Sequence, residues 1–315
     1  MSQIAVNQVT TTMPQNGWQL FLSLAKGLQQ PGDAWRDSAY RRKFMLRSLA
    51  SAFTTGQLLS KLAQQPLLDE LLHVQPGLPC RLHRPYLSVN FNRKDTLNAL
   101  CFHYHTLNQR MPEKLLRDHL TQKGARLAQL VGKDESRYSI DFCAISNLDK
   151  EGEATLVMLN EEGTALAELT FTLCHYRGKT TLFIGGLQGA KSWVPHDAIQ
   201  NATKACHGLF PKRLLLEAAC QLAQHLDARQ ILAVSNSTHI YRSWRYQKKK
   251  QDKLHADYDS FWLSMKGELL ADGYFRMPGE VARKPLEDIA SKKRAEYRRR
   301  YSLLGGMVES IASQF

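Results

Sequence analysis

Residues 180–262 constrain the fold most strongly, because strand, loop, helix and strand patterns follow one another there. TTLFIGGLQG has the β-branched and aromatic residues of a buried strand and ends in glycines. PKRLLLEAACQLAQHL is an apolar helix pattern, and QILAV is a second short strand. The order is β-loop-α-β, in which ligands usually bind at the carboxyl ends of the strands. We therefore expect a site at residues 185–189 and 235–241.

Five strand-like runs precede or open this unit: RLAQLV, YSIDFCAI, ATLVMLN, ALAELTFTLC and TTLFIGG. In the fourth run apolar and polar residues alternate, with Leu169, Phe171 and Leu173 on one face and Thr170 and Thr172 on the other. This alternation predicts a half-buried strand. Residues 160–163 suit a hairpin loop. The sequence predicts an α+β fold whose sheet is mixed and mostly antiparallel.

Helices are expected on both sides of this core. Residues 18–30, 40–53 and 57–73 repeat apolar positions at helical spacing, and four prolines and glycines between 76 and 85 end that region. We expect a strand at 86–91, helices at 96–108 and 113–123, and a basic amphipathic C-terminal helix at 286–304. The predicted organisation is an N-terminal helical region (1–80), an α/β core (81–264) and a basic helical tail (265–315).

Composition restricts the class of protein. Hydrophobic residues make up 43% of 315, and the six cysteines form no Cys-x-x-Cys pair, as expected for small buried side chains in a reducing compartment. The first 25 residues lack Lys and Arg, and no segment is apolar enough to span a bilayer. We expect a cytoplasmic protein, either free or peripheral at the inner membrane. The net charge of +13 favours an anionic partner.

Several segments together resemble one family. GGLQG, ATKACHGLFPKRLLLEA, VSNSTHIYRSWRYQKKK, HADYDSFW and RKPLEDIASKKRAEYRRRY are similar to the VirK/YbjX family of Gram-negative bacteria, over most of the chain. The resemblance implies a role in virulence, the cell envelope or tolerance of antimicrobial peptides. It implies no established reaction, so the chemistry has to come from the residues.

The order of elements also resembles the Gcn5-related acyltransferases, in which a meander leads into a strand, a pyrophosphate-binding loop, a helix and a strand that splays away. Asn236 after the second strand and Tyr241 close behind match the asparagine and general-acid tyrosine often found there. This resemblance implies an acyl thioester cofactor. The loop before the helix departs from the pattern, because it offers Gly208 alone and Pro211 has no N–H to donate. An acyl-carrier-protein donor and no donor at all both stay open.

Candidate site residues follow from these positions. An imidazole and a phenol at a strand end, His239 and Tyr241, are candidate general base and general acid; the alternative is that His239 caps the backbone and Tyr241 packs its ring. Cofactor-binding candidates are Gly185, Gly186, Gly189, Gly208 and Asn236. For the glycines, a tight turn or bulge is the competing interpretation.

Charged residues near the end of the core suggest a second kind of site. Trp244 and Tyr246 are interleaved with an anion-binding strip formed by Arg242, Arg245, Lys248, Lys249 and Lys250. A solvated helix face is the competing interpretation. We expect HADYDSFW to be extended, which would put Asp257 and Asp259 on one side, either as a general base or as ion-pair partners of the arginines.

No metal site is expected. His103 and His105 lack an accompanying cluster of Cys or carboxylates, and adjacent Cys206 and His207 diverge on a helix, so they form no nucleophile pair. Two hypotheses remain. One is an acyltransferase-like enzyme acting on an envelope precursor, and the other is a non-catalytic protein that binds anionic lipid, or less favourably RNA, through its basic C-terminal third.

Overall fold

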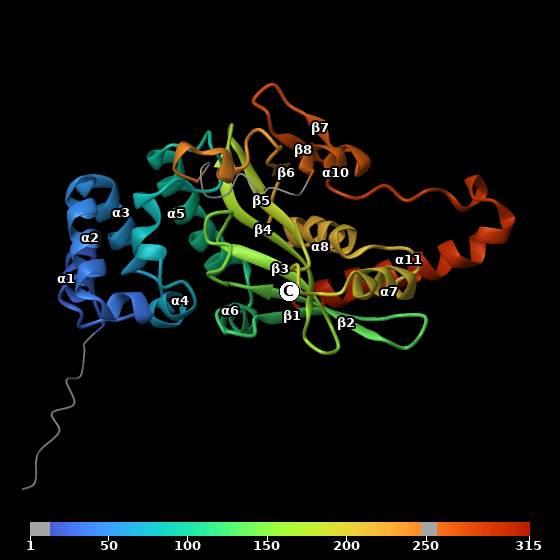
Figure 1. The fold of residues 1–315 in the computed structure, drawn as a ribbon, viewed down its shortest axis with the longest axis horizontal. Helices are drawn as coiled ribbons and strands as arrows, with labels where there is room; N and C mark the ends of the chain where they lie inside the picture. Colours follow the sequence, from blue (N-terminus) through green and yellow to red (C-terminus); the bar gives the residue numbers. More distant parts are fainter. Residues whose placement is uncertain (1–12, 247–256) are drawn as a thin grey trace, which may run out of the picture. The chain divides into compact units, whose positions relative to one another are not determined.

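The computed structural model describes residues 13–246 and 257–315 (Figure 1). Lys248, Lys249 and Lys250 of the proposed anion-binding strip lie outside these residues. The chain forms two compact units, Met1–His83 and Arg84–Phe315. The first consists of helices, and the second is built around one large sheet.

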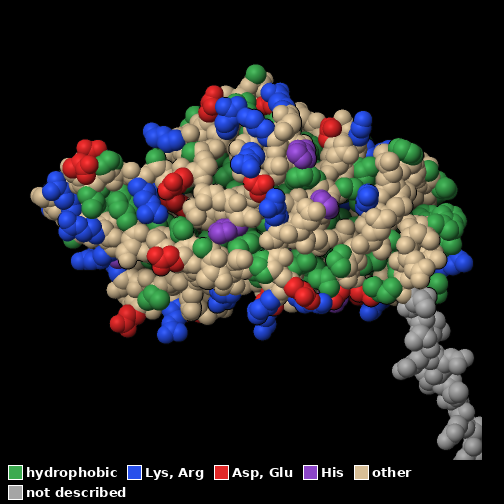
Figure 2. Space-filling model, turned by 180° about the vertical axis from the view of Figure 1, so that it is seen from behind, with side chains coloured by type: hydrophobic (Ala, Val, Ile, Leu, Met, Phe, Trp, Pro, Cys, Tyr) green, Lys and Arg blue, Asp and Glu red, His purple; other side chains and the backbone are tan. Residues whose placement is uncertain are grey.

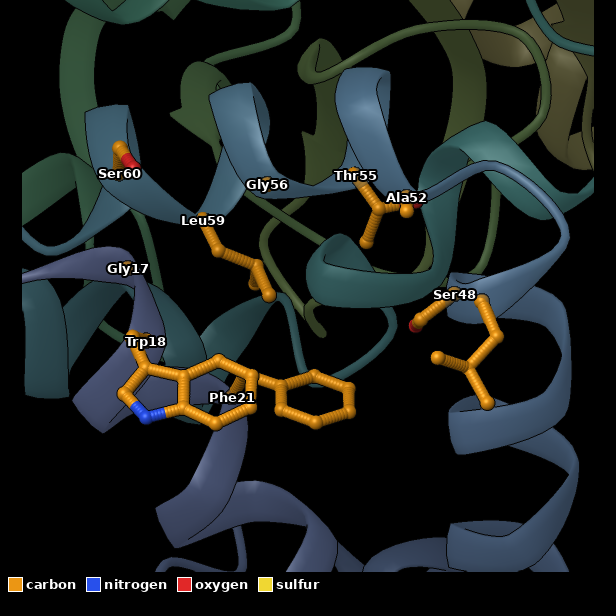
Figure 3. A pocket seen from close by; sticks show the side chains of 10 residues that line it. Gly17, Trp18, Phe21, Ser48, Ala52, Thr55, Gly56, Leu59 and Ser60 are labelled. Carbon is orange, nitrogen blue, oxygen red and sulfur yellow. The ribbon is translucent and has the colours of Figure 1, made fainter.

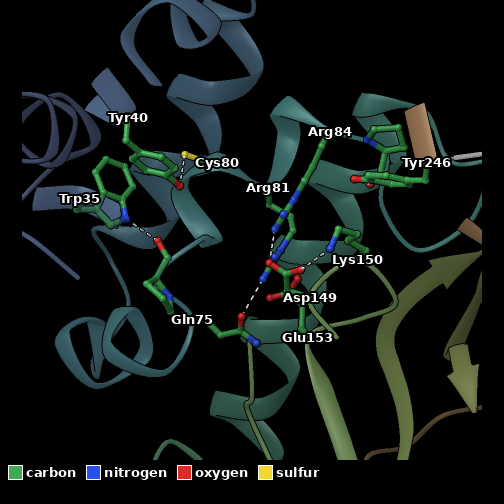
Figure 4. Close-up of polar contacts among 12 residues, drawn as sticks. Trp35, Tyr40, Gln75, Cys80, Arg81, Arg84, Asp149, Lys150, Glu153 and Tyr246 are labelled. Carbon is green, nitrogen blue, oxygen red and sulfur yellow. Dashed lines mark hydrogen bonds and ion pairs between the residues drawn. The ribbon is translucent and has the colours of Figure 1, made fainter. Parts of the chain in front are cut away.

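The first unit is an assembly of short helices, as the apolar spacing predicts. Its elements are α1 (Gly17–Lys26), η1 (Asp33–Arg36), α2 (Ser38–Leu49), α3 (Ala52–Leu62), α4 (Leu68–Val74) and η2 (Leu78–His83). Asn16 and Asp37 cap α1 and α2 by accepting backbone N–H groups. Trp35 and Phe44 fill the core with edge-to-face contact, and the Trp35 indole donates to Pro76 O at 2.7 Å (Figure 4). The predicted helical segment 57–73 is divided into α3 and α4, because Pro66 interrupts it. Helix α1 ends before residue 30, because Gly27 adopts the left-handed conformation.

The second unit contains an eight-stranded sheet in the order β1-β2-β3-β4-β5-β6-β8-β7. The strands are β1 (Ala125–Val131), β2 (Arg137–Cys143), β3 (Ala154–Asn160), β4 (Ala165–Tyr176), β5 (Lys179–Gly189), β6 (Gln230–Ala233), β7 (Glu268–Leu269) and β8 (Phe275–Met277). Among these described strands, β5 and β6 pair in parallel, and the other neighbours pair antiparallel. The predicted mixed, mostly antiparallel α+β fold is confirmed, and so is the hairpin loop after Asn160.

Helices of the second unit cover this sheet. They are α5 (Arg93–Arg110), α6 (Glu113–His119), α7 (His196–Ala205), α8 (Pro211–His225), η3 (Ile240–Arg242), α10 (Tyr258–Ser264), η5 (Leu286–Asp288) and α11 (Ser291–Ala312). Helix α8 connects the parallel pair and packs on β3 to β6, and α5 packs on β4. Helix α11 packs on β1 and α8 through buried Leu304, Met307 and Ile311. It begins after the predicted start, because the residues before it form only a 3-10 turn.

Three expectations about local structure are wrong. Residues 86–91 form no strand and contribute one bridge, between Ser88 and His239. Strand β4 is buried on both faces, because Thr170 and Thr172 are covered and hydrogen bonded to Thr155 and Tyr86. Residues 257–262 of HADYDSFW are not extended, because Asp257 is the N-cap of α10 and accepts the Ser260 N–H, while His255 and Ala256 lie outside the described residues. Side-chain capping thus overrides the strand-like composition of that segment.

Candidate functional site

A buried carboxyl group marks the carboxyl ends of β5 and β6. The loop between β2 and β3 crosses the sheet and places the fully buried Glu151 side chain against β5. Gln188 on β5 donates its amide to both carboxyl oxygens at 2.9 Å, and the Tyr241 hydroxyl forms a further hydrogen bond with the same carboxyl. His239 Nε2 lies 3.8 Å from Glu151 Oε1. We call Glu151, Gln188, His239, Tyr241 and Tyr258 the acid cluster.

Glycines on β5 make room for this loop. A Cβ on Gly185 would collide with the Glu151 carbonyl oxygen, and a Cβ on Gly186 would collide with the Glu151 carboxyl group. Gly189 is different, since a Cβ there would meet only the Lys212 side chain at 3.6 Å. Two of the three predicted ligand-cradle glycines therefore have a structural reason that requires no ligand: the close approach of a second backbone segment.

Several contacts hold the loop in place (Figure 4). Leu87 donates its N–H to Lys150 O at 2.8 Å, and Arg84 forms an ion pair with Asp149. The Lys150 ammonium lies 5.8 Å from the centre of the Tyr246 ring, whose hydroxyl donates to Pro85 O at 3.3 Å. The backbone that carries Glu151 is thus held through the two residues that precede it, Asp149 and Lys150.

His239 is neutral near pH 7 and acts as a hydrogen-bond donor. Burial, followed by the charge of Arg242, lowers its pKa to about 4. Its Nδ1 accepts the Tyr241 N–H at 3.2 Å, which leaves the proton of the neutral ring on Nε2. That nitrogen lies 3.4 Å from the Tyr258 hydroxyl and faces Glu151. His239 therefore caps the backbone, as the structural interpretation proposed, and also belongs to the acid cluster.

Two phenols complete the cluster. The Tyr241 ring packs edge-on against His239 at 4.8 Å, and the Tyr258 ring stacks on its other side at 5.1 Å. Burial, followed by the nearby Glu151 charge, raises the pKa of both hydroxyls. Tyr258 is buried, whereas Tyr241 is half-exposed. Tyr241 therefore connects the buried carboxyl with the surface.

The carboxyl group of Glu151 is tuned to exchange a proton near neutral pH. Burial raises its pKa to about 7, although the hydrogen bonds from Gln188 and Tyr241 act in the opposite direction. A carboxyl with this pKa is a suitable general base or acid under physiological conditions. The cluster is therefore able to perform acid–base chemistry, with Glu151 as the titrating group.

Asn236 has a different role from the predicted one. Its side chain donates to Asp257 Oδ1 at 2.9 Å and accepts the Tyr258 N–H at 2.9 Å. Its own N–H donates to Asp259 Oδ1 at 2.8 Å. These bonds attach the start of α10 to the end of β6. The two aspartates thus bind backbone and capping groups of α10 and β6.

The space where β5 and β6 diverge is filled by α10. The Leu187 N–H donates to the Tyr258 hydroxyl at 3.3 Å, and the Trp262 indole donates to Val234 O at 2.8 Å. These are backbone groups that a thioester arm would need between the splayed strands. At the other end, Gly208 has φ +82° and donates its N–H to Thr203 O at 2.7 Å, which closes α7. The residues between β5 and β6 and at the Gly208 turn therefore do not fit coenzyme A bound in the usual way.

The anion-binding strip is described only in part. Arg242 and Arg245 are exposed, and Trp244 between them is 82% exposed. Arg242 donates through Nε to Asn236 O at 3.2 Å, so its stem is attached to the site while part of its guanidinium faces solvent. Over the face seen in Figure 2, Lys and Arg side chains are spread among acidic ones.

Sequence reasoning found His239 and Tyr241 but missed Glu151, Gln188 and Tyr258. Glu151 lies in the polar loop DKEGE, which looks like an ordinary turn. The only signal was indirect: a β5 strand with consecutive glycines requires a close neighbour. For metals, the part of the chain that the structure describes brings together no group of three or more His, Cys, Asp or Glu side chains that could hold an ion.

The fold and site define a mixed α+β protein with a buried acid cluster at the end of its one parallel strand pair. The family described as "Protein of unknown function (DUF535)" matches residues 33–313, and the chain belongs to this family. It is 49% identical over 315 residues to "Uncharacterized protein YbjX" of Escherichia coli K12, covering 100% of this chain and 95% of that one. The VirK/YbjX resemblance is thereby confirmed.

More distant relatives occur in Haemophilus influenzae. One "Uncharacterized protein" is 28% identical over 227 residues, covering 72% of this chain and 73% of its own. Another is 27% identical over 285 residues, covering 87% and 89%. Among the described residues, no helix is both long and apolar enough to cross a membrane.

Proposed function

We propose that the protein is an acyltransferase-like enzyme that acts on a cell-envelope precursor and uses Glu151 as its general base. The observation that carries the proposal is the buried Glu151 carboxyl, whose pKa is raised to about 7 and which hydrogen bonds to a half-exposed tyrosine. A structural carboxyl gains nothing from such a site, because burial without a cationic partner costs free energy.

The roles of the cluster follow from its contacts. Tyr241 presents its hydroxyl to a substrate nucleophile and passes the released proton to Glu151. Gln188 and the Nε2 proton of His239 stabilise the carboxylate before it accepts that proton. Tyr258 orients His239 through the stacked ring and its hydroxyl. In this proposal Glu151 replaces His239 as the general base, and His239 is a positioning residue.

The order of elements supports the acyltransferase-like class. An antiparallel meander leads into β5, helix α8 crosses over, and β6 pairs in parallel with β5 only as far as Ile184 and Ala233. Fold similarity alone does not determine a reaction. Since the Gly208 N–H is used to close α7, a carrier-protein donor, which has no nucleotide pyrophosphate to bind, fits better than free coenzyme A. Its thioester arm would enter elsewhere than between β5 and β6, where Tyr258 and Trp262 take the backbone groups. The envelope substrate rests on the family resemblance.

Conservative variants test this proposal. Tyr241→Phe and Glu151→Gln, expressed in a strain that lacks the gene, are expected to abolish tolerance of antimicrobial peptides, because loss of a proton-transfer group typically costs about 10²–10⁴ in rate. Tyr176→Phe is the matched control, since its hydroxyl donates to Asp272 and not to Glu151. Thermal midpoints are measured in parallel. Loss of tolerance that merely follows a lowered midpoint would show a structural role instead.

A second candidate is a non-catalytic protein that binds anionic lipid, or RNA, through its basic C-terminal third. It is favoured by Trp244, an exposed indole flanked by Arg242 and Arg245. Reversing Arg242, Arg245 and Lys249 to Glu is expected to weaken binding to anionic vesicles or to single-stranded RNA, and so is added salt. Binding to vesicles favours a peripheral position at the inner membrane, and binding to RNA favours a regulatory role.

A further inference from the structure

The N-terminal unit contains an apolar cavity that the acid cluster does not use. Helices α1, α2 and α3 surround about 320 Å³ of open space (Figure 3). Trp18 and Phe21 of α1 form one wall as a stacked pair at 5.5 Å, and Leu49 and Leu59 contribute from α2 and α3. The cavity is largely lined by carbon, so it suits a hydrocarbon ligand.

Large apolar side chains are exposed on the cavity wall, at Trp18 and Leu49, and on the same helices beside it. Trp18 is 66%, Leu49 70% and Phe53 77% exposed, and Leu46 lies one turn before Leu49 on α2. Figure 2 shows hydrophobic side chains gathered on this unit, at the right of the view. Single exposed apolar residues are ordinary, but a contiguous group beside an apolar cavity marks an interaction surface.

The same helices carry positive charge only. Helices α1 to α3 contain no Asp or Glu, and their basic residues are Lys26, Arg41, Arg42, Lys43, Arg47 and Lys61. Arg41 is engaged with the Trp35 and Arg36 carbonyls, whereas Arg42, Lys43 and Arg47 are exposed. Arg42, Leu46 and Leu49 share a helix face. Helix α2 therefore carries positively charged and exposed apolar side chains on the same face.

Two residues of the wall point to an occupant. Ser48 is buried, its side chain faces the space in Figure 3, and its Oγ has no hydrogen-bond partner among the described residues. Buried hydroxyls are normally paired, so this one suits a polar group of a ligand. Gly56 lies inside α3, where glycine is unfavourable, and a Cβ there would meet nothing within 4 Å.

We propose that this surface docks on an anionic phospholipid bilayer. Trp18, Leu49 and Phe53 insert among the acyl chains, and the cavity takes up the end of one chain. Arg42, Lys43 and Arg47 face the headgroup phosphates, and the Ser48 hydroxyl in the cavity wall donates to an ester oxygen of that chain. Neutral membranes lack the charge that these cations complement, and a protein partner would need a face both apolar and acidic. The inference does not depend on the acid cluster or on catalysis.

Vesicle co-sedimentation of the full chain tests the proposal. The protein is expected to bind vesicles of phosphatidylglycerol and phosphatidylethanolamine and to bind phosphatidylcholine vesicles at least roughly tenfold more weakly. Leu49→Ser/Phe53→Ser is expected to weaken binding about tenfold or more, because the full burial of one such side chain is worth about that factor. Arg42→Glu/Lys43→Glu/Arg47→Glu is expected to have a similar effect.

Matched controls separate this surface from general stickiness and from the C-terminal strip. Trp193→Ser/Leu269→Ser removes two side chains of the other unit that are also exposed, and it is expected to bind as the unchanged protein does. Equal loss in that control, or undiminished binding by the N-terminal variants, overturns the proposal. Loss confined to Arg242→Glu/Arg245→Glu assigns membrane binding to the strip instead.

Depth of insertion provides an independent measurement. Phospholipids brominated on their acyl chains are expected to quench the Trp18 fluorescence, and Trp18→Phe is expected to remove most of that quenching. Quenching that persists in Trp18→Phe places another indole in the membrane and contradicts the inference. A concentration-dependent dimer, seen by analytical ultracentrifugation and dissolved by Phe53→Ser, would show that a second copy covers the face, and it too overturns the proposal.

Discussion

The acid cluster and the N-terminal cavity differ in which kind of side chain is placed in an unfavourable environment. The first buries a carboxyl group and satisfies it with an amide, a phenol and an imidazole. The second leaves aromatic side chains exposed and a hydroxyl group unpaired among the described residues. Both arrangements cost free energy in the isolated protein. Such costs concentrate where a protein meets a substrate or a partner, which is why these two regions carry the two proposals.

The largest expected effect is on the pH dependence of the free energy of unfolding, and it comes from Glu151 of the acid cluster. The pKa of Glu151 is raised from 4.5 to about 7, so between these values the folded state binds more protons than the unfolded state. The contribution of Glu151 therefore favours folding at low pH and is lost as pH rises towards 7, by about 3 kcal/mol in total.

Urea unfolding of the unchanged protein and of Glu151→Gln across this range measures the effect. His103, His119 and His239 have lowered pKa values and act in the opposite sense in both proteins, so only the difference between the two curves is informative. Parallel curves would mean that Glu151 titrates normally and would remove the basis of the catalytic proposal.

The next effect concerns Gly186. An added methyl group would collide with the Glu151 carboxyl, so Gly186→Ala is expected to lower the free energy of unfolding by about 2 kcal/mol. The double variant Gly186→Ala/Glu151→Ala is expected to recover part of this loss, which denaturant titration measures. If the two losses simply add, the glycine is not there to accommodate Glu151.

Removing the buried Ser48 hydroxyl from the cavity is expected to stabilise the protein, in contrast to the substitution at Gly186. Ser48→Ala is expected to raise the free energy of unfolding by about 1 kcal/mol, because it removes an unpaired polar atom from an apolar wall. Hydrogen exchange of peptides from α2 and α3 assigns the change to this unit. A loss of stability would mean that an ordered water or another group already satisfies the hydroxyl.

The smallest effect comes from a second glycine. Gly56→Ala is expected to stabilise α3 by roughly 0.5–1 kcal/mol, since a Cβ meets open space and alanine favours the helix. The same substitution thus has opposite signs at Gly186 and Gly56. Thermal unfolding followed by circular dichroism compares them directly, and a destabilised Gly56→Ala would show that α3 requires the glycine for packing.

Much of the fold was predictable because it depends on local patterns. Strand-like apolar runs and a glycine-containing hairpin loop placed β1 to β5, and apolar helical spacing placed α1 and α8. HADYDSFW was predicted wrongly because its aromatic residues favour a strand, while the Asp257 cap and the packing of Trp262 favour a helix. The short α7 was not predicted, since it contains few large apolar residues.

By itself, the sequence determined the α+β class, the succession of strands, the family and the position of His239 and Tyr241 at a strand end. Only the tertiary structure decided that Glu151, from a polar loop far away in the chain, lies against both of them. It also decided that apolar residues of three separate helices surround one cavity. The physical reason is that periodicity records which face of an element is buried, whereas a site depends on which distant groups share that burial.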